Sequence, residues 1–312
     1  MGLNWRTEKY MFLGGLALLC VVLLFVGGPG PYSSRTFTYA WGLGHLFCFA
    51  LWTYLYLAWR SPQPWLRQVG EVIFLALLVG ACSELLQAGF GREATWQDLG
   101  NDLLGSLLSL AFAPAIKRQL PALRILLFRF LVLALVGWAI IPFAKVAIDD
   151  LVARQQFPLL SGFETPLELS RWGGASKRQL DRQYVYSGST TLRVDFSTSR
   201  YSGVALKYFP ADWSSYQELR FQIYNPEKDP LQLYFRIHDQ KHKLSDNRYS
   251  DRYNTSFVAA TGWSEIKILL SEVTQAPRDR RMDLSKTAGM ILFVDKLDRS
   301  RTIYLDDVAL HH

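Results

Sequence analysis

Long apolar segments dominate the first half of this 312-residue chain, and they constrain its fold more than any other feature. Five segments approach the roughly 20 residues with which a helix crosses a bilayer. They lie near residues 10–28, 38–59, 69–89, 98–116 and 122–146. The fourth is the weakest, because it opens with Asp98, Asn101 and Asp102. We therefore expect an all-α transmembrane bundle of about five helices over residues 1–147.

Basic residues between these segments predict the orientation, since cytoplasmic loops are enriched in Lys and Arg. One side would carry Arg6, Lys9, Arg60, Arg67, Lys117, Arg118 and Arg124, and the other Arg35, Arg92, Lys145 and Arg154. The N-terminus is therefore expected in the cytoplasm, and five crossings place the chain after about residue 147 outside. No small-x-small cleavage site follows the first segment, so we interpret it as a retained anchor. The expected location is a bacterial inner (plasma) membrane, with a periplasmic or extracellular C-terminal domain.

The second half has a different pattern. Seven short segments within residues 161–312 alternate apolar and polar residues, with turn-forming residues between them. Period-two alternation is typical of strands that bury one face, and strands at this spacing predict an all-β jelly-roll sandwich. We interpret residues 148–160 as a linker. The predicted fold class is therefore multi-domain, with a helical membrane bundle followed by a β-sandwich.

The charge distribution excludes nucleic acid as a partner. The formal net charge of +7 is spread over both halves, with 12 basic against 8 acidic residues in 1–160 and 22 against 19 in 161–312. No dense Lys/Arg patch of the kind that binds nucleic acid is present. The three cysteines, Cys20, Cys48 and Cys82, lie in apolar segments, which favours neither a disulfide framework nor a thiolate metal site.

Ionisable and amide side chains lie inside or beside the apolar segments. A charge in hydrocarbon costs several kcal/mol, so such groups usually face a bundle interior or an aqueous cavity and have a function. The predicted polar pocket comprises His45, Glu84, Gln87, Arg92, Asp98 and Asn101. At 1.5 Å per residue, His45 lies about 10 Å and Glu84 about 7–8 Å from the outer ends of their segments. We expect one outward-facing pocket, in which His45 and Glu84 are the candidate catalytic acid and base.

The same side chains also fit structural roles. Gln87 and Asn101 could form hydrogen bonds between helices. Thr95 and Asp98 fit a capping box at a helix N-terminus, with Asp in place of the usual Glu. Arg92 could pair with a neighbouring carboxylate or a lipid phosphate. Both interpretations stay open from the sequence.

The order of these residues resembles a known family. The pattern His45 … Glu84-x-x-Gln87 … Arg92 … Asp98-x-x-Asn101-x-x-x-Gly105 is similar to that of the VanZ-like family of small bacterial membrane proteins, over roughly residues 35–115. The family is named for a low-level glycopeptide-resistance protein. The resemblance therefore implies a cell-envelope context related to antibiotic resistance, and it implies no particular reaction. The family pattern often has Lys or Asp shortly before the His, whereas this chain has TYAWGLGHL there.

The second half resembles galactose-binding-like β-sandwiches, the fold of many carbohydrate-binding modules, over about residues 161–310. The resemblance rests on Phe163-Glu164, Trp213, the segment from Asp239 to Asn254, Gly262-Trp263 and the terminal IYLDDVAL. It implies a glycan-binding fold and leaves the ligand open. We expect Trp213 and Trp263 to lie in the core rather than to form a sugar platform.

Sugars present apolar C–H faces and hydroxyl groups, which aromatic and planar hydrogen-bonding side chains contact. The candidate ligand-binding residues are Tyr201, Tyr234, Arg236, His238, Tyr249, Arg252 and Tyr253, unless these only form the solvated side of a sheet. Many relatives carry a structural calcium ion near the first and last strands. The resemblance therefore implies a calcium site at Glu164, Asp306 and Asp307, whose oxygens are suitable ligands.

Three functions are compatible with this organisation. The favoured one is an envelope protein whose outer domain binds a glycan, and whose membrane bundle recognises a lipid or lipid-linked precursor. The second is an intramembrane enzyme acting on a phospholipid or polyprenyl-linked substrate, with Arg92 holding an anion. The third is a structural or sensory scaffold that binds another protein. The sequence contains no nucleophile elbow, phosphate loop or His/Cys metal motif that would favour an enzyme.

Overall fold

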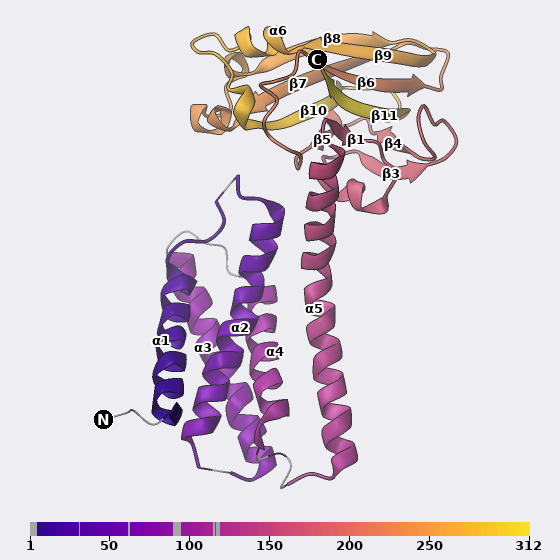
Figure 1. Ribbon diagram of the computed structural model, residues 1–312. Helices are drawn as coiled ribbons and strands as arrows, with labels where there is room; N and C mark the ends of the chain where they lie inside the picture. Colours follow the sequence, from indigo (N-terminus) through magenta and orange to yellow (C-terminus); the bar gives the residue numbers. More distant parts are fainter. Residues whose placement is uncertain (1–4, 31, 62, 90–94, 115, 117–118) are drawn as a thin grey trace. The chain divides into compact units, whose positions relative to one another are not determined.

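The computed structural model describes residues 5–30, 32–61, 63–89, 95–114, 116 and 119–312 (Figure 1). The chain divides into two compact units, Met1–Val146 and Ala147–His312, and each is described by itself. The first is helical and the second is a β-sandwich.

Five helices account for the first unit and the start of the second. They are α1 (Trp5–Phe25), α2 (Arg35–Trp59), α3 (Trp65–Gly89), α4 (Trp96–Phe112) and α5 (Ala122–Gln156). Four of them, all except α4, are long and apolar enough to cross a membrane. With 17 residues, α4 is about 26 Å long. The expected fourth span is therefore present as a helix but is too short to qualify as a span by length.

Hydrogen bonds between helices connect α2 to α1 and show that α2 and α4 run in the same direction. Trp52 of α2 donates from its indole to the backbone oxygen of Ala17 in α1 at 3.2 Å. Asn101 and Ser109 of α4 donate to backbone oxygens of α2 that lie progressively further along that helix, at Gly42 and Ala50. Helices α2 and α4 therefore run parallel, as alternate helices of an up-and-down bundle do.

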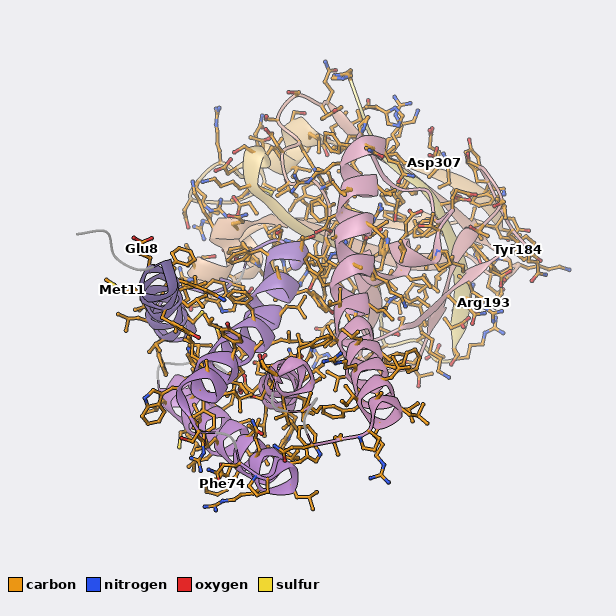
Figure 2. All side chains as sticks on the ribbon, turned by 60° about the horizontal axis from the view of Figure 1, so that its bottom comes forward. Glu8, Met11, Phe74, Tyr184, Arg193 and Asp307 are labelled. Atoms are coloured by element: carbon orange, nitrogen blue, oxygen red, sulfur yellow. The ribbon has the colours of Figure 1, made fainter. Side chains whose placement is uncertain are left out.

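Apolar side chains project outward from the helices. Met11 of α1 is 65% exposed and Phe74 of α3 is 63% exposed, and both point away from the neighbouring helices (Figure 2). Soluble domains bury such side chains, whereas helices that face lipid expose them. The exposed apolar side chains on the described helices are therefore of the kind that helices facing lipid carry.

The linker expected over residues 148–160 is helical up to Gln156. Helix α5 continues to Gln156, and β1 (Leu159–Ser161) follows almost at once. Asp149, Asp150 and Arg154 end the apolar run, but the end of an apolar run is not the end of a helix, and Asp149 is held by a buried ion pair with Arg171.

The second unit contains two antiparallel sheets. Its elements are β1 (Leu159–Ser161), β2 (Trp172–Gly173), β3 (Lys177–Asp181), β4 (Thr191–Phe196), β5 (Tyr201–Leu206), β6 (Glu218–Asn225), β7 (Leu231–Asp239), β8 (Tyr253–Ala259), β9 (Gly262–Leu269), α6 (Leu270–Gln275), β10 (Thr287–Asp295) and β11 (Arg301–His311). One sheet has the order β3-β4-β11-β6-β9, with β1 on β11, and the other has the order β2-β5-β10-β7-β8. The predicted β-sandwich is confirmed.

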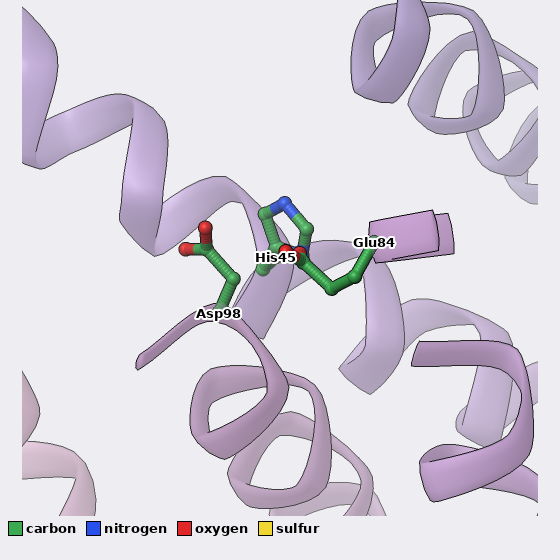
Figure 3. A group of neighbouring side chains, drawn as sticks. All are labelled: His45, Glu84 and Asp98. Atoms are coloured by element: carbon green, nitrogen blue, oxygen red, sulfur yellow. The ribbon is translucent and has the colours of Figure 1, made fainter. Parts of the chain in front are cut away.

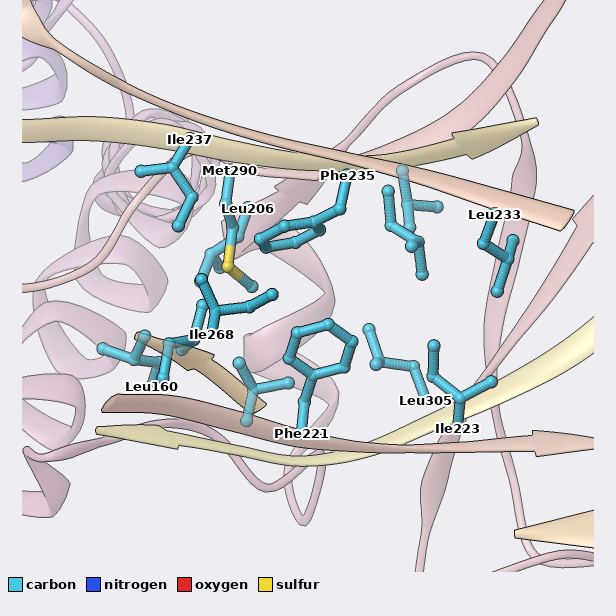
Figure 4. Packing of buried hydrophobic residues seen from close by; sticks show 14 of the residues in the cluster. Leu160, Leu206, Phe221, Ile223, Leu233, Phe235, Ile237, Ile268, Met290 and Leu305 are labelled. Atoms are coloured by element: carbon cyan, nitrogen blue, oxygen red, sulfur yellow. The ribbon is translucent and has the colours of Figure 1, made fainter. Parts of the chain in front are cut away.

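The core of the sandwich lies between the two sheets. Phe221 of β6 and Phe235 of β7 meet across it with ring centroids 5.2 Å apart (Figure 4). Strand β7 shows why the sequence alternates: Leu231, Leu233 and Phe235 are at most 2% exposed, while the residues between them face outward. Trp213 is fully buried, as expected, and its indole donates to the backbone oxygen of Pro210.

A buried ion pair ties the last turns of α5 to the sandwich. The guanidinium of Arg171 donates to the carboxylate of Asp149 at 2.8 and 3.0 Å and to the backbone oxygen of Leu160 at 3.0 Å. Arg171 is fully buried and Asp149 is 1% exposed. The folded second unit therefore begins before residue 161, inside the helix.

Candidate functional site

Three helices bring ionisable side chains together at one end of the bundle. His45 of α2, Glu84 of α3 and Asp98 of α4 each place one nitrogen or oxygen within 4.8 Å of the others (Figure 3). His45 is 2% exposed and Glu84 is 6% exposed. The expectation that helices α2, α3 and α4 contribute to a single polar site agrees with this geometry.

His45 is held in place by a residue that the sequence analysis did not include in the pocket. Its Nδ1 lies 2.9 Å from a carboxylate oxygen of Asp102, which is fully buried. Asp98 and Asp102 are four residues apart and therefore lie on one face of α4. That spacing is the sequence signal for including Asp102 in the pocket, whereas the sequence analysis uses Asp102 only to explain why the fourth apolar segment is weak.

Glu84 connects α3 to the start of α4. One of its oxygens accepts a hydrogen bond from the backbone N–H of Thr95, the N-cap residue of α4, at 2.8 Å. Thr95 in turn accepts from the backbone N–H of Asp98 and donates its hydroxyl proton to the Asp98 carboxylate. The predicted N-terminal cap of α4 is confirmed. In a standard capping box the third helical residue accepts a hydrogen bond from the N-cap N–H, and here Glu84 accepts it instead.

The remaining predicted pocket residues have other positions. Gln87 donates its side-chain amide to the backbone oxygen of Leu24 in α1 at 2.9 Å, and Asn101 donates to Gly42 of α2 at 3.1 Å. Both therefore join helices, which was the structural alternative. Arg92 lies outside the described residues.

Small residues let the three helices approach closely enough to form this site. A Cβ atom on Gly105 would lie 2.1 Å from the backbone oxygen of Leu46 in α2. A Cβ on Gly80 would lie 2.6 Å from the Asp102 carboxylate. Real side chains do not tolerate such distances, so glycine at both positions sets the spacing of α4 from its neighbours.

The second candidate site is the outer face of the β2-β5-β10-β7-β8 sheet. Tyr234, Arg236 and His238 alternate along β7 with buried residues and so share this face. Phe293 is paired with Tyr234 in the sheet register, and the two rings stack with centroids 5.5 Å apart. Tyr201 meets the edge of Phe293 at 6.1 Å. Three aromatic rings thus form a row beside cationic and imidazole side chains.

The arginines on this face are not paired with carboxylates in the described part of the chain. Among the described residues, neither Arg236 nor Arg252 forms an ion pair, and the Nε of Arg236 and Nδ1 of His238 are buried without a hydrogen-bond partner. Burial, followed by the charge of Arg252, lowers the pKa of Arg236 to about 10. Burial, followed by the charge of Arg236, lowers the pKa of His238 to about 4.

The nearest carboxylates are already engaged. Arg280 bridges Asp239 and Asp251, with N–O distances of 2.5 and 2.6 Å. Arg252 donates to the Asn254 amide at 2.9 Å and lies over the exposed ring of Tyr249, 5.3 Å from its centroid. The Nε–H of Arg236 therefore remains available to donate a hydrogen bond to an incoming ligand.

Two aromatic residues lie elsewhere than expected. Tyr253 is only 7% exposed and belongs to the core, because it is paired in register with the inward-facing Ile237. Trp263 is half-buried outside the core, on the outer face of the other sheet, which corrects the core assignment. An aromatic cluster that the sequence analysis missed surrounds it, formed by Tyr184, Tyr186, Tyr224 and Tyr304.

Two of the carboxylates expected to hold calcium, those of Glu164 and Asp306, accept hydrogen bonds from backbone N–H groups in this structure. Glu164 accepts from the hydroxyl of Ser189 and from the backbone N–H groups of Ser189 and Thr190, and these hydrogen bonds hold the pKa of its carboxyl below the usual range. Asp306 is fully buried and accepts from the N–H groups of Tyr186 and Asp307, while burial raises its pKa to about 6. Calcium at these residues stays a prediction.

Comparison with known proteins places the second unit in a family. Residues 161–309 match the family model described as carbohydrate binding domain (family 11). The C-terminal unit is a family 11 carbohydrate-binding domain. The match includes no residue of the helical unit, and no curated protein matches the chain.

Solved structures similar to this domain include carbohydrate-binding modules of Clostridium thermocellum. A family 11 module in complex with a beta-1,3-1,4-mixed-linked tetrasaccharide is 17% identical with a TM-score of 0.37, and the match covers 49% of this chain and 94% of that one. A family 30 module from a cellulosomal cellulase is 18% identical with a TM-score of 0.34, covering 45% and 90%. An exo-beta-agarase is 19% identical with a TM-score of 0.40, covering 49% and 24%.

Proposed function

We propose that this chain is an integral membrane protein of the bacterial cell envelope whose C-terminal domain binds a glycan outside the cell. The family 11 match of residues 161–309 is the observation that carries the proposal. Four helices of membrane-spanning length with exposed apolar side chains support the location. The VanZ-like order of residues in α2 to α4 supports an envelope context, with a membrane lipid or lipid-linked precursor as a second partner.

We place the glycan on the outer face of the β2-β5-β10-β7-β8 sheet. The ring pair of Tyr234 and Phe293 offers a flat apolar surface to the C–H face of a sugar. Arg236 and His238 beside it have buried polar atoms without partners, and sugar hydroxyls or carboxylates are acceptors and donors of the right kind. Because both arginines on this face lack carboxylate partners, a glycan that carries carboxylates fits better than a neutral one.

Binding of the detergent-solubilised full-length chain to a panel of neutral and uronate-containing envelope polysaccharides tests this assignment. Replacing Tyr234 with Ala is expected to weaken binding about 3- to 10-fold, the range that aromatic contacts contribute. Tyr186→Ala is the matched control, because this tyrosine is 51% exposed in the loop between β3 and β4 and contacts Trp263 of the other sheet. An effect of Tyr186→Ala alone would move the site to that aromatic cluster. Equal, weak retention of every polysaccharide would refute glycan binding and favour a protein-binding scaffold.

An intramembrane enzyme is the second candidate, and the convergence of His45, Glu84 and Asp98 favours it. A positioned imidazole beside two carboxylates can transfer protons to or from a phospholipid or polyprenyl-linked substrate. If a normally folded Glu84→Gln variant leaves cells as susceptible to envelope antibiotics as the null allele does, this result supports the enzyme role. Wild-type susceptibility would exclude it.

A further inference from the structure

The cluster at the end of the bundle contains more negative charge than the surrounding residues neutralise. Glu84, Asp98 and Asp102 contribute three carboxylates, and His45 is the one basic side chain paired with them among the described residues. Oxygens of Glu84 and Asp102 are buried without a hydrogen-bond partner. Because a buried carboxylate is costly without a partner, this arrangement calls for either protons or a bound cation.

The unpartnered oxygen belongs to a side chain that is directed into the cluster. Glu84 is 94% buried, one of its oxygens is taken by the Thr95 N–H, and its carboxylate extends towards His45 (Figure 3). Its other oxygen is therefore available to a ligand between α2, α3 and α4. This buried oxygen without a partner distinguishes the cluster from a group of acidic residues on a surface, where water forms hydrogen bonds to each oxygen.

The imidazole is oriented as in metal sites. A histidine that binds a metal usually donates its second ring N–H to a carboxylate, which fixes the tautomer and makes the free nitrogen a better ligand. Asp102 occupies this position, 2.9 Å from Nδ1 of His45. Nε2 is then the nitrogen that remains to bind a metal ion.

We propose that His45, Glu84 and Asp98 bind one divalent transition-metal ion, with Asp102 as a positioning residue. One imidazole and two carboxylates suit Zn²⁺, whose catalytic sites have three protein ligands and an open fourth position. Ligand atoms around tetrahedral Zn²⁺ are about 3.3 Å apart, from bond lengths of about 2.0 Å. The present atoms lie within 4.8 Å of one another, so the widest separation must shorten by up to roughly 1.5 Å when a metal ion binds.

Zinc binding by the full-length chain in detergent tests the site. The protein is prepared without a histidine tag, and His311→Ala and His312→Ala remove the terminal histidine pair. After treatment with EDTA and re-addition of Zn²⁺ alone, mass spectrometry of the metal content and calorimetry give the stoichiometry and Kd. We expect one Zn²⁺ per chain, at least 100-fold weaker binding in Glu84→Gln, and 10- to 100-fold weaker binding in Asp102→Asn at unchanged stoichiometry.

Two further variants make the outcome decisive. Glu71→Gln is the control on the same helix, because Glu71 pairs with Arg60 and Arg67, 13 residues from Glu84 and about 20 Å along α3. Its Kd should equal that of the parent. Asp98→Asn replaces a half-buried carboxylate and keeps the proposal testable if Glu84→Gln misfolds. Zinc bound equally by the Asp98, Glu84 and Glu71 variants, or zinc binding no stronger than to the detergent blank, would overturn the proposal.

Discussion

Replacing Asp149 with Asn should strongly destabilise the carbohydrate-binding domain, although Asp149 lies in a helix outside the family match. Arg171 and Asp149 are 0% and 1% exposed, so neither charge has water as an alternative partner. Removing one member of a buried ion pair costs about 3–5 kcal/mol, because the other charge is left buried. Against a usual domain stability of about 5–15 kcal/mol, this is a large fraction.

The same geometry predicts where a soluble domain must begin. A fragment 147–312 retains Asp149 and β1, whereas a fragment 161–312 loses the partner of Arg171 and also Leu160, which is 1% exposed in the core. Burial of a leucine contributes about 1.5–3 kcal/mol. The shorter fragment should therefore be less stable by about 5–8 kcal/mol. The sequence-based expectation that the domain starts at 161 would then yield a largely unfolded protein.

Urea unfolding of fragment 147–312, followed by tryptophan fluorescence, measures both effects. With a slope of about 2 kcal/mol per molar, Asp149→Asn should lower the midpoint by roughly 1.5–2.5 M. Asp298→Asn, in an exposed loop, is the control and should leave the midpoint unchanged. If Asp149→Asn unfolds at the wild-type midpoint, or if fragment 161–312 is as stable as 147–312, the ion pair contributes nothing and the reasoning is refuted.

Three further outcomes follow from the structure. Gly105→Ala should destabilise the solubilised chain by about 1–3 kcal/mol in a thermal melt, because its Cβ would meet the Leu46 backbone, while Gly100→Ala, with open space around it, should not. Acidification from pH 6.5 to 4 has opposing effects on the stability of fragment 147–312. The lowered pKa of His238 (about 4) makes the unfolded state bind more protons than the folded state, which reduces stability as the pH falls. The raised pKa of Asp306 (about 6) makes the folded state bind more protons than the unfolded state, which increases stability as the pH falls. Each contributes about 3 kcal/mol. Relative to the wild type, the urea midpoint should therefore fall more steeply on acidification in Asp306→Asn and less steeply in His238→Gln, while the lowered pKa of His242 destabilises all three proteins as the pH falls. Parallel pH profiles would contradict this assignment. Binding of a uronate-containing glycan should weaken as salt rises from 50 to 500 mM and lose that dependence in Arg236→Gln, whereas a salt-independent affinity in the parent would exclude a role for charge.

Much of the helical unit follows from local patterns. Runs of apolar residues predict α1, α2, α3 and α5, and the Thr95–Asp98 signal predicts the start of α4. The end of α5 was not predictable from composition, because Asp149 forms a buried ion pair with an arginine 22 residues away. A contact of that range leaves no local signal in the sequence.

In the β-sandwich, too, local patterns predict some features, whereas others depend on contacts between distant segments. Alternation along β7 correctly placed Tyr234, Arg236 and His238 on one face, because side chains of a strand alternate strictly. Alternation alone does not say which face is buried, so the adjacent Tyr253 was assigned to the ligand site although it lies in the core. The aromatic cluster around Trp263 was missed because its members come from separate strands and loops.

The sequence by itself determined that this chain has an apolar helical half and a β-sandwich half, because the period and length of apolar patterns follow directly from backbone geometry and burial. It also predicted that Glu84 lies near the end of one helix and Asp98 in the first turn of the next, whereas His45 lies near the middle of α2. Only the tertiary structure decided that their ligand atoms meet within 4.8 Å, that Asp102 orients the imidazole and that Gln87 faces α1. Helix rotation and spacing set these contacts, and both are fixed by close packing at Gly80 and Gly105.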